Sequence, residues 1–192
     1  MKTRKIIKTK SAKNKTKSVR VFKKEHYNSG DGMLTTVWGP PTWHSLHTIS
    51  FNYPVHPTCQ DKINYRNHIL NLRFVLPCGK CRANLCKNFN KLPLTMKHMK
   101  SRETFSKYVY DLHEIINKML GKKSALSYND VRERYEHFRA RCNTIVQIKN
   151  KENGCTEPIY GEKSKCVLHI VPEKKVCSSF QIEEECKKRI IK

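Results

Sequence analysis

Residues 105–121 read FSKYVYDLHEIINKMLG, the most periodic stretch of the chain. Its apolar side chains recur mostly at steps of three and four residues, the spacing that places side chains on one face of an α-helix: Phe105, Val109, Leu112, Ile116, Met119 and Leu120. Gly121 is a typical residue to end such a helix. The stretch therefore predicts an amphipathic helix with one face buried against other helices.

Four more helices are predicted around this one, separated by prolines and glycines. They run from beside Pro40-Pro41 to about Phe51, over roughly 59–75, from the cysteine pair at Cys78 to near Phe89, and from about Asn129 to Arg141. No convincing strand pair is present. Because the connections are short, we expect an all-α fold: an antiparallel four-helix bundle with a short fifth helix.

The length of 192 residues, with 38% hydrophobic content, supports one modest core. Residues 1–25 are rich in Lys, Ser and Thr, so we expect a disordered basic arm. Residues 26–142 form the predicted folded domain. Residues 143–192 are expected to be an irregular tail, with four widely separated cysteines: Cys155, Cys166, Cys177 and Cys186.

Charge is concentrated at the start of the chain. Eleven of the first 24 residues are Lys or Arg and none is acidic, within a net charge of +23. Such an arm attracts nucleic acid or another polyanion through salt-sensitive forces. The alternative is that the arm is only a solvated tail.

No stretch approaches the roughly 20 apolar residues that a membrane helix needs, and the basic start lacks the apolar segment of a secretory signal. We therefore expect an intracellular protein without a transmembrane segment. Nine cysteines are many for such a protein, and in that setting cysteines are more often metal ligands or redox centres than structural disulfides.

The strongest local signal is Pro77-Cys78-Gly79-Lys80-Cys81. Proline before a Cys-x-x-Cys opens a helix, and the free amides and dipole of its first turn favour the thiolate form. A thiolate is the species that attacks and exchanges disulfides. The alternative is half of a zinc site, with Cys86 and His98 as the nearest further ligands, although the spacing matches no common zinc finger.

A second motif lies upstream, at residues 38–48: WGPPTWHSLHT. Trp43 and His47 are four residues apart, so on a helix they share a face and can flank a flat ring system. The alternative is ordinary packing in a core.

These motifs come in an order that resembles the Erv/ALR sulfhydryl oxidases, most of all the members encoded by large DNA viruses. The shared pieces are Trp-x-x-Leu-His-Thr from Trp43, Tyr53-Pro54, Pro77-Cys-x-x-Cys, residues 112–122 and Glu133-Arg134-Tyr135. The resemblance implies a homodimeric helical bundle with FAD at its mouth, in the host cytoplasm or the virion.

The resemblance also implies site residues. Cys78 would face incoming protein dithiols and Cys81 would lie against the flavin, which oxygen would reoxidise with release of peroxide. The predicted cofactor-binding residues are Gly39, Trp43, His47, His113, Asn117, Lys122, Arg134 and Tyr135. The competing hypothesis is a basic nucleic-acid-associated protein with cysteine-bound zinc.

The chain departs from the family pattern in several places. Glu114 replaces an asparagine of the cofactor motif, and Tyr110 and Ser127 stand where cellular members have a structural disulfide. We therefore expect packing or bound FAD to compensate for that crosslink. Two hypotheses stay open for the tail cysteines, a mobile electron-carrying pair or a structural role. Buried free thiols are expected for three others: Cys59, Cys86 and Cys142.

Overall fold

The computed structural model describes residues 21–141, 157–172, 174–175 and 181–187. The chain divides into two units after Asp31. In the first unit, a single helical turn, α1 (Lys24–Tyr27), packs its rings on Phe22. This helical turn includes the last two residues of the expected arm. Its first 20 residues lie outside the described part of the chain.

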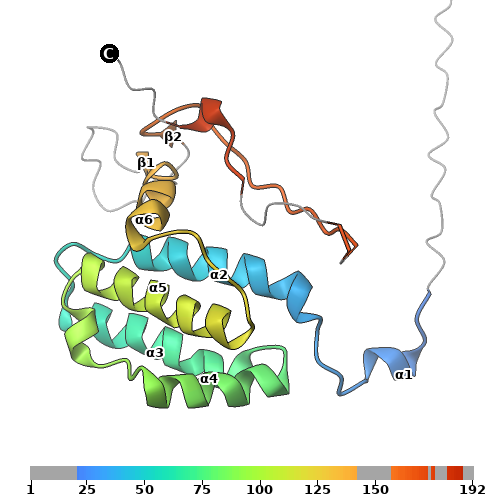
Figure 1. Cartoon of the computed structure of the whole chain (residues 1–192). Helices are drawn as coiled ribbons and strands as arrows, with labels where there is room; N and C mark the ends of the chain where they lie inside the picture. Colours follow the sequence, from blue (N-terminus) through green and yellow to red (C-terminus); the bar gives the residue numbers. More distant parts are fainter. Residues whose placement is uncertain (1–20, 142–156, 173, 176–180, 188–192) are drawn as a thin grey trace, which may run out of the picture. The chain divides into compact units, whose positions relative to one another are not determined.

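Four long helices form the body of the second unit: α2 (Thr35–Phe51), α3 (Cys59–Val75), α4 (Gly79–Lys91) and α5 (Arg102–Met119). In this bundle α5 packs against α2 and α4, and α3 packs against α4 (Figure 1). The predicted all-α bundle is confirmed.

Helix α2 begins at Thr35, five residues before the predicted start at Pro40-Pro41, and contains both prolines. Two hydrogen bonds donated by Trp38 hold the first turn of α2, before the prolines. The backbone amide of Trp38 donates to the carbonyl of Leu34 at 3.2 Å, and its indole Nε1 donates to the carbonyl of Met33 at 3.0 Å. Each proline removes one amide donor and crowds the carbonyl four residues before it, yet α2 continues through both to Phe51.

Helices α3 and α4 begin at side-chain caps. Thr58 accepts from the backbone amide of Asp61, whose carboxylate accepts from the amide of Thr58 at 2.9 Å, forming a capping box. Cys78 is the N-cap residue of α4. The predicted range of 59–75 is confirmed for α3, and α4 extends to Lys91, slightly beyond the predicted end.

Helix α5 provides the centre of the core. Ser101 caps its start, and it ends before Gly121, which adopts a positive φ of 67° as expected for a helix stop. A short 3-10 helix, η1 (Met96–Met99), precedes it. The most deeply buried apolar side chains come from α3, α5 and the segments around η1 and α2: Tyr53, Ile69, Met99, Phe105, Tyr108, Val109 and Leu112.

Helix α6 (Tyr128–Glu136) is shorter than predicted, because the chain becomes extended shortly after it. Strand β1 (Ala140–Arg141) pairs antiparallel with β2 (Glu157–Pro158), so the expectation of no strand pair is wrong at this point. The amide of Ile159 adds a hydrogen bond to the carbonyl of Arg139 at 3.0 Å. A two-residue pair this far apart in sequence leaves no alternating pattern to detect.

The described part of the tail is otherwise irregular apart from η2 (Glu184–Cys186). Cys166 is exposed and Cys186 is half-buried, and both are free thiols, whereas Cys142, Cys155 and Cys177 lie outside the described residues. Cys59 and Cys86 are also free but exposed, which corrects the expectation that they are buried. None of the described helices is both long and apolar enough to cross a membrane.

Candidate active site

Cys78 and Cys81 are joined in a disulfide at the N-terminal turn of α4. The backbone amide of Cys81 donates to the Sγ atom of Cys78 at 3.2 Å. Both residues are half-buried, so the sulfurs are held by the helix and still reached from solvent. Opening this disulfide would place the Cys78 sulfur among unpaired helix amides, which stabilise a thiolate.

A short segment before α2 contacts this turn. The amide of Met33 donates to the carbonyl of Pro77 at 2.8 Å. A side chain at Gly32 would place its Cβ 3.0 Å from the same oxygen and 3.4 Å from the Cα atom of Cys78. Only glycine fits there without displacing the backbone that carries the disulfide.

One face of α2 leads from the disulfide into the bundle. It carries residues at four-residue steps: Thr35, Gly39, Trp43, His47 and Phe51. The hydroxyl of Thr35 lies 3.8 Å from the Sγ atom of Cys81. Each four-residue step advances about 40° beyond a full turn, so the α2 face that these residues form winds around the helix by about 160° over a length of about 24 Å. Only successive members of the series lie directly side by side.

An aromatic cluster occupies the far part of this face. The ring of Trp43 stacks on that of His113 from α5, with centroids 3.9 Å apart and planes 7° apart. His47 Nε2 and His113 Nδ1 are 3.0 Å apart, within hydrogen-bond distance. Tyr135 of α6 lies 5.4 Å from His47, centroid to centroid. Three helices therefore bring four of the predicted cofactor residues together.

Both histidines of the cluster are neutral near pH 7. Burial lowers the pKa of His47 to about 3, with further contributions from His113 and His44. Burial and the charge of Lys122 lower the pKa of His113 to about 4. The Nδ1 atom of His47 is buried without a hydrogen-bond partner. An unsatisfied buried nitrogen is uncommon, and it marks a place where a bound group can make a hydrogen bond.

Helix α5 supplies two further predicted residues. Asn117 lies one turn after His113 and donates from Nδ2 to the carboxylate of Glu114 at 3.1 Å. Glu114 is the position that departs from the family pattern, and its carboxylate accepts the hydrogen bond that holds the Asn117 side chain. Lys122 follows the end of the helix, and its amide donates to the Asn117 carbonyl at 2.9 Å.

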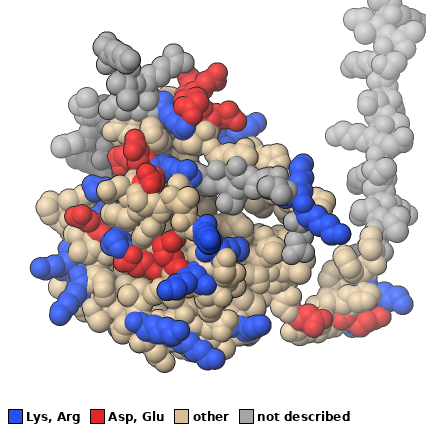
Figure 2. Space-filling model, viewed as in Figure 1, with Lys and Arg blue, Asp and Glu red and all other residues tan. Residues whose placement is uncertain are grey.

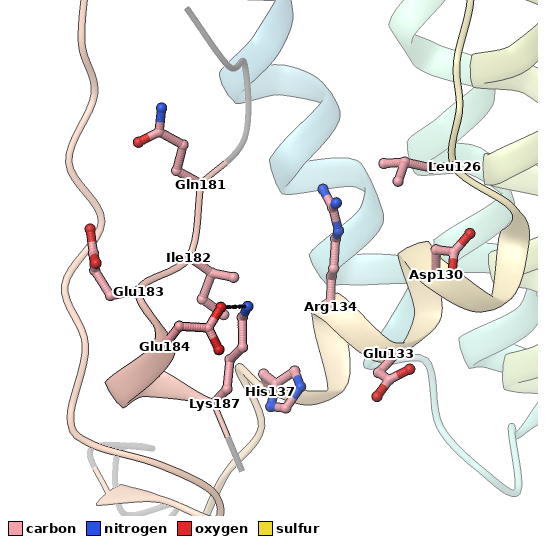
Figure 3. A pocket seen from close by; sticks show the side chains of 10 residues that line it. All are labelled: Leu126, Asp130, Glu133, Arg134, His137, Gln181, Ile182, Glu183, Glu184 and Lys187. Atoms are coloured by element: carbon pink, nitrogen blue, oxygen red, sulfur yellow. Dashed lines mark hydrogen bonds and ion pairs between the residues drawn. The ribbon is translucent and has the colours of Figure 1, made fainter. Parts of the chain in front are cut away.

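Arg134 and Gly39 have surroundings different from those of the aromatic cluster. Arg134 lines a cavity of about 650 Å³ between α6 and residues 181–187 (Figure 3). Across that cavity the side chain of Lys187 pairs with Glu184. Gly39 lies on the α2 face, where an added Cβ would make only an ordinary 3.8 Å contact with Thr35.

Three residues of this site were not predicted from the sequence. Thr35 and Phe51 continue the four-residue spacing of Trp43 and His47 in both directions, so that spacing could have indicated them. Phe51 stacks on Tyr135 with ring centroids 5.3 Å apart. The Nδ1 atom of His44 lies 3.1 Å from the Tyr135 hydroxyl, a contact across 91 residues that no local pattern encodes.

The zinc alternative required two more ligands beside the cysteine pair. Within the described residues, no group of three or more His, Cys, Asp or Glu side chains is placed to hold a metal ion. His98 instead caps η1, where its Nδ1 atom accepts from the amide of Thr95 at 3.1 Å.

Comparison with known proteins shows to which family the chain belongs. Residues 40–143 match the model of the Erv1 / Alr family. The chain belongs to the Erv1/Alr family. A probable FAD-linked sulfhydryl oxidase of Acanthamoeba polyphaga mimivirus is 40% identical over 99 residues, which are 52% of this chain and 68% of that protein.

A second viral relative of this Erv1/Alr chain spans a similar region. An FAD-linked sulfhydryl oxidase of African swine fever virus (isolate Tick/Malawi/Lil 20-1/1983) is 32% identical over 56% of this chain and 86% of its own length. The crystal structure of the yeast Erv1 core covers 63% of this chain and 95% of that one, with a TM-score of 0.50 and 22% identity, and supports the fold alone. The region that matches the family model contains the disulfide and all the predicted cofactor residues except Gly39.

Proposed function

We propose that Cys78 and Cys81 are the redox pair through which this Erv1/Alr chain oxidises thiols to disulfides with FAD. The activity follows from the family: the chain is an FAD-linked sulfhydryl oxidase. The residue assignment rests on one observation above all. The half-buried disulfide lies at one end of an α2 face, and aromatic and neutral polar groups line the rest of that face.

The residues along this face suit FAD. Trp43 and His113 offer flat aromatic surfaces for its ring systems. The unpartnered Nδ1 atom of His47 offers a hydrogen bond, and Lys122 offers positive charge for its diphosphate. Gly39, Asn117, Arg134 and Tyr135 complete the proposed set. Bound FAD supplies the two-electron acceptor that the sulfur chemistry needs.

The sulfur chemistry begins when a substrate thiolate attacks the Sγ atom of Cys78. The Cys78–Cys81 bond breaks, Cys81 leaves as a thiolate, and a mixed disulfide forms between Cys78 and the substrate. A second substrate thiolate then attacks the substrate sulfur of that bond and releases Cys78. The substrate has lost two electrons, which the pair now holds as two thiolate sulfurs, while the two protons of the substrate thiols have passed to solvent.

The second half of the cycle returns the pair to a disulfide. Cys81 is the proposed exit for the electrons, because its sulfur is the one next to Thr35 on the α2 face. The neutral state of His47 and His113 keeps uncompensated positive charge away from the aromatic cluster. Oxygen is the proposed final acceptor, with release of peroxide.

Protein dithiols are the proposed substrates. The homodimer, the intracellular location in host cytoplasm or virion, and polyanion binding by residues 1–25 remain predictions. An ultracentrifugation measurement of the FAD-loaded chain would test the dimer.

The assignment of the redox pair is tested by two substitutions and a matched control. Cys78→Ser and Cys81→Ser should each abolish oxygen uptake driven by dithiothreitol while FAD stays bound. Cys86→Ser removes an exposed free thiol from the same helix and should leave oxygen uptake at the wild-type rate. Full activity in both pair variants, with FAD absorbance retained, would refute the assignment.

A further inference from the structure

Between residues 62 and 102 the chain contains ten Lys or Arg residues and no Asp or Glu. This stretch comprises nearly all of α3, the redox disulfide, α4 and η1. None of the ion pairs found among the described residues involves a side chain in it. Figure 2 shows the result on one face of the molecule, where blue side chains without red neighbours gather over the α4 end of the bundle.

Several of these basic side chains are occupied in holding the fold. The guanidinium of Arg66 donates to the carbonyl of Leu94 at 3.0 Å, and that of Arg102 donates to the carbonyl of Tyr53 at 2.6 Å. Both residues are half-buried. Their positive charge is therefore fixed in the structure, while the lysines of the stretch remain available to a partner.

Three exposed lysines of α4 form an ordered row. Lys80, Lys87 and Lys91 follow at steps of seven and four residues, a spacing that keeps side chains on one helix face. The row starts between the two redox cysteines and covers about 16 Å at 1.5 Å per residue. We name these three lysines the α4 basic row. An extended polyanion lying along it would have one end beside the disulfide.

Exposed apolar side chains lie near the same end of the row. Phe74 and Val75 are 63% and 68% exposed and stand directly before the Leu76-Pro77 turn. Met33 is 68% exposed, and its amide is bonded to the carbonyl of Pro77. The phosphate backbone of a nucleic acid gains nothing from contact with aliphatic side chains such as Val75 and Met33, whereas apolar side chains of a polypeptide are shielded from water on contacting them.

We propose that the α4 basic row is the docking surface for an acidic polypeptide segment that carries the substrate thiols. The inference deepens the proposed oxidase function and depends on it. The row adds no redox step: it raises the local concentration of an anionic substrate at Cys78, where thiol exchange then occurs. Interactions of this type accelerate association by factors of roughly 10 to 1,000 and weaken as salt rises.

The test compares two peptides with the same central Cys-x-x-Cys, one flanked by glutamates and the other by lysines. Their kcat/KM values are measured by oxygen uptake with the FAD-loaded full-length chain, beside dithiothreitol as a small uncharged substrate. At low salt the acidic peptide should react about tenfold faster or more. The preference should nearly vanish at about 1 M salt, where the screening length is about 3 Å.

The row itself is tested by K87E/K91E, with the exposed pair K165E/K174E as a control that changes the net charge equally. Each peptide rate is divided by the dithiothreitol rate of the same variant. The acidic preference should be lost or reversed in K87E/K91E and kept in K165E/K174E. FAD absorbance and circular dichroism verify that each variant is folded.

The remaining outcomes separate failure of the docking proposal from failure of the oxidase function. If the wild-type chain oxidises dithiothreitol but shows no preference between the peptides, the docking proposal fails and the oxidase function stands. Equal loss of preference in both double variants would make it an effect of net charge and overturn the row. If an oligonucleotide binds in a K87E/K91E-sensitive manner while the peptides react alike, the row serves nucleic acid and the proposal is wrong. If dithiothreitol is not oxidised at all, the oxidase function itself fails.

Discussion

His47 and His113 show how the fold can keep individual histidines neutral. Each lies among aromatic rings, and each imidazole faces another ring nitrogen at 3.0 Å instead of an acid. Burial is the first cause of the lowered pKa of both, because a charged imidazole would lose its hydration there. The site therefore keeps two neutral imidazoles over a wide pH range.

This arrangement predicts a pH dependence of stability. The pKa of His47 is about 6.5 when unfolded and about 3 when folded, so the unfolded chain binds the proton first as pH falls. Stability should be full above about pH 6.5 and should decline as pH falls toward 4. For His47 the loss is roughly 1.4 kcal/mol per pH unit.

Denaturant unfolding of the FAD-free chain at several pH values between 7 and 4.5 measures this slope. His47→Asn should give a shallower slope than wild type, although it lowers stability at pH 7. His56→Asn changes an exposed histidine outside the helices and should keep the wild-type slope. An unchanged slope in His47→Asn would show that this imidazole is not the source of the acid sensitivity.

At the scale of elements, the segment before α2 matters most for the disulfide. It reaches α4 through the Met33 amide and through the close approach of Gly32 to the backbone of Pro77 and Cys78. The atom 3.0 Å from an added Cβ is a backbone oxygen, which cannot move away by a side-chain rotation. Any larger residue at Gly32 must therefore move the turn that carries the nucleophile.

Gly32→Val should lower the rate of dithiothreitol oxidation several-fold and reduce the free energy of unfolding by about 1–3 kcal/mol. Gly30→Val is the matched control, since nothing lies within 4 Å of a Cβ at Gly30. Oxygen uptake and denaturant unfolding measure the two effects. A Gly32→Val chain with wild-type values in both would mean that this close approach does not position the disulfide.

The junction of α5 and α6 shows how one element replaces a missing crosslink. At the position of the absent cysteine, the hydroxyl of Tyr110 donates to the carbonyl of Leu126 at 2.8 Å. The rings of Tyr110 and Tyr128 are in edge contact, with centroids 5.8 Å apart. Ser127, the other position, caps α6 through the amide of Asp130. Hydrogen bonds and ring contacts therefore hold the chain at both positions where the crosslink of cellular members would lie.

For the whole molecule, the cofactor should contribute to stability as well as to chemistry. A ligand that binds only the folded chain stabilises it by about 2.7 kcal/mol at one hundred times its dissociation constant. Removing FAD should therefore lower Tm, and adding it back should restore Tm in a concentration-dependent way. Thermal unfolding with and without FAD measures the difference.

Two variants separate binding from redox chemistry in that measurement. Trp43→Ala removes half of the stacked aromatic pair and should lose most of the FAD-dependent rise in Tm. Cys78→Ser leaves that pair intact and should keep the rise. A full rise in Trp43→Ala would place the cofactor elsewhere.

The sequence by itself determined the helices and the chemistry. The periodic apolar residues of α5, the capping pair at Thr58 and the proline before Cys78 act within a few residues, so their structural consequences can be predicted locally. The ordered motifs also identified the family, the cysteine pair and the residues of the aromatic cluster. In each case the information lies at short, fixed spacings along the chain.

Only the tertiary structure decided how distant segments meet. The contact of Gly32 with Cys78, the pairing of His44 with Tyr135 and the exposure of Cys59 depend on packing between elements far apart in sequence. The start of α2 before its prolines and the β1–β2 pair arise in the same way. Contacts between distant segments leave no periodic signal, because each is set by the packing of the whole bundle.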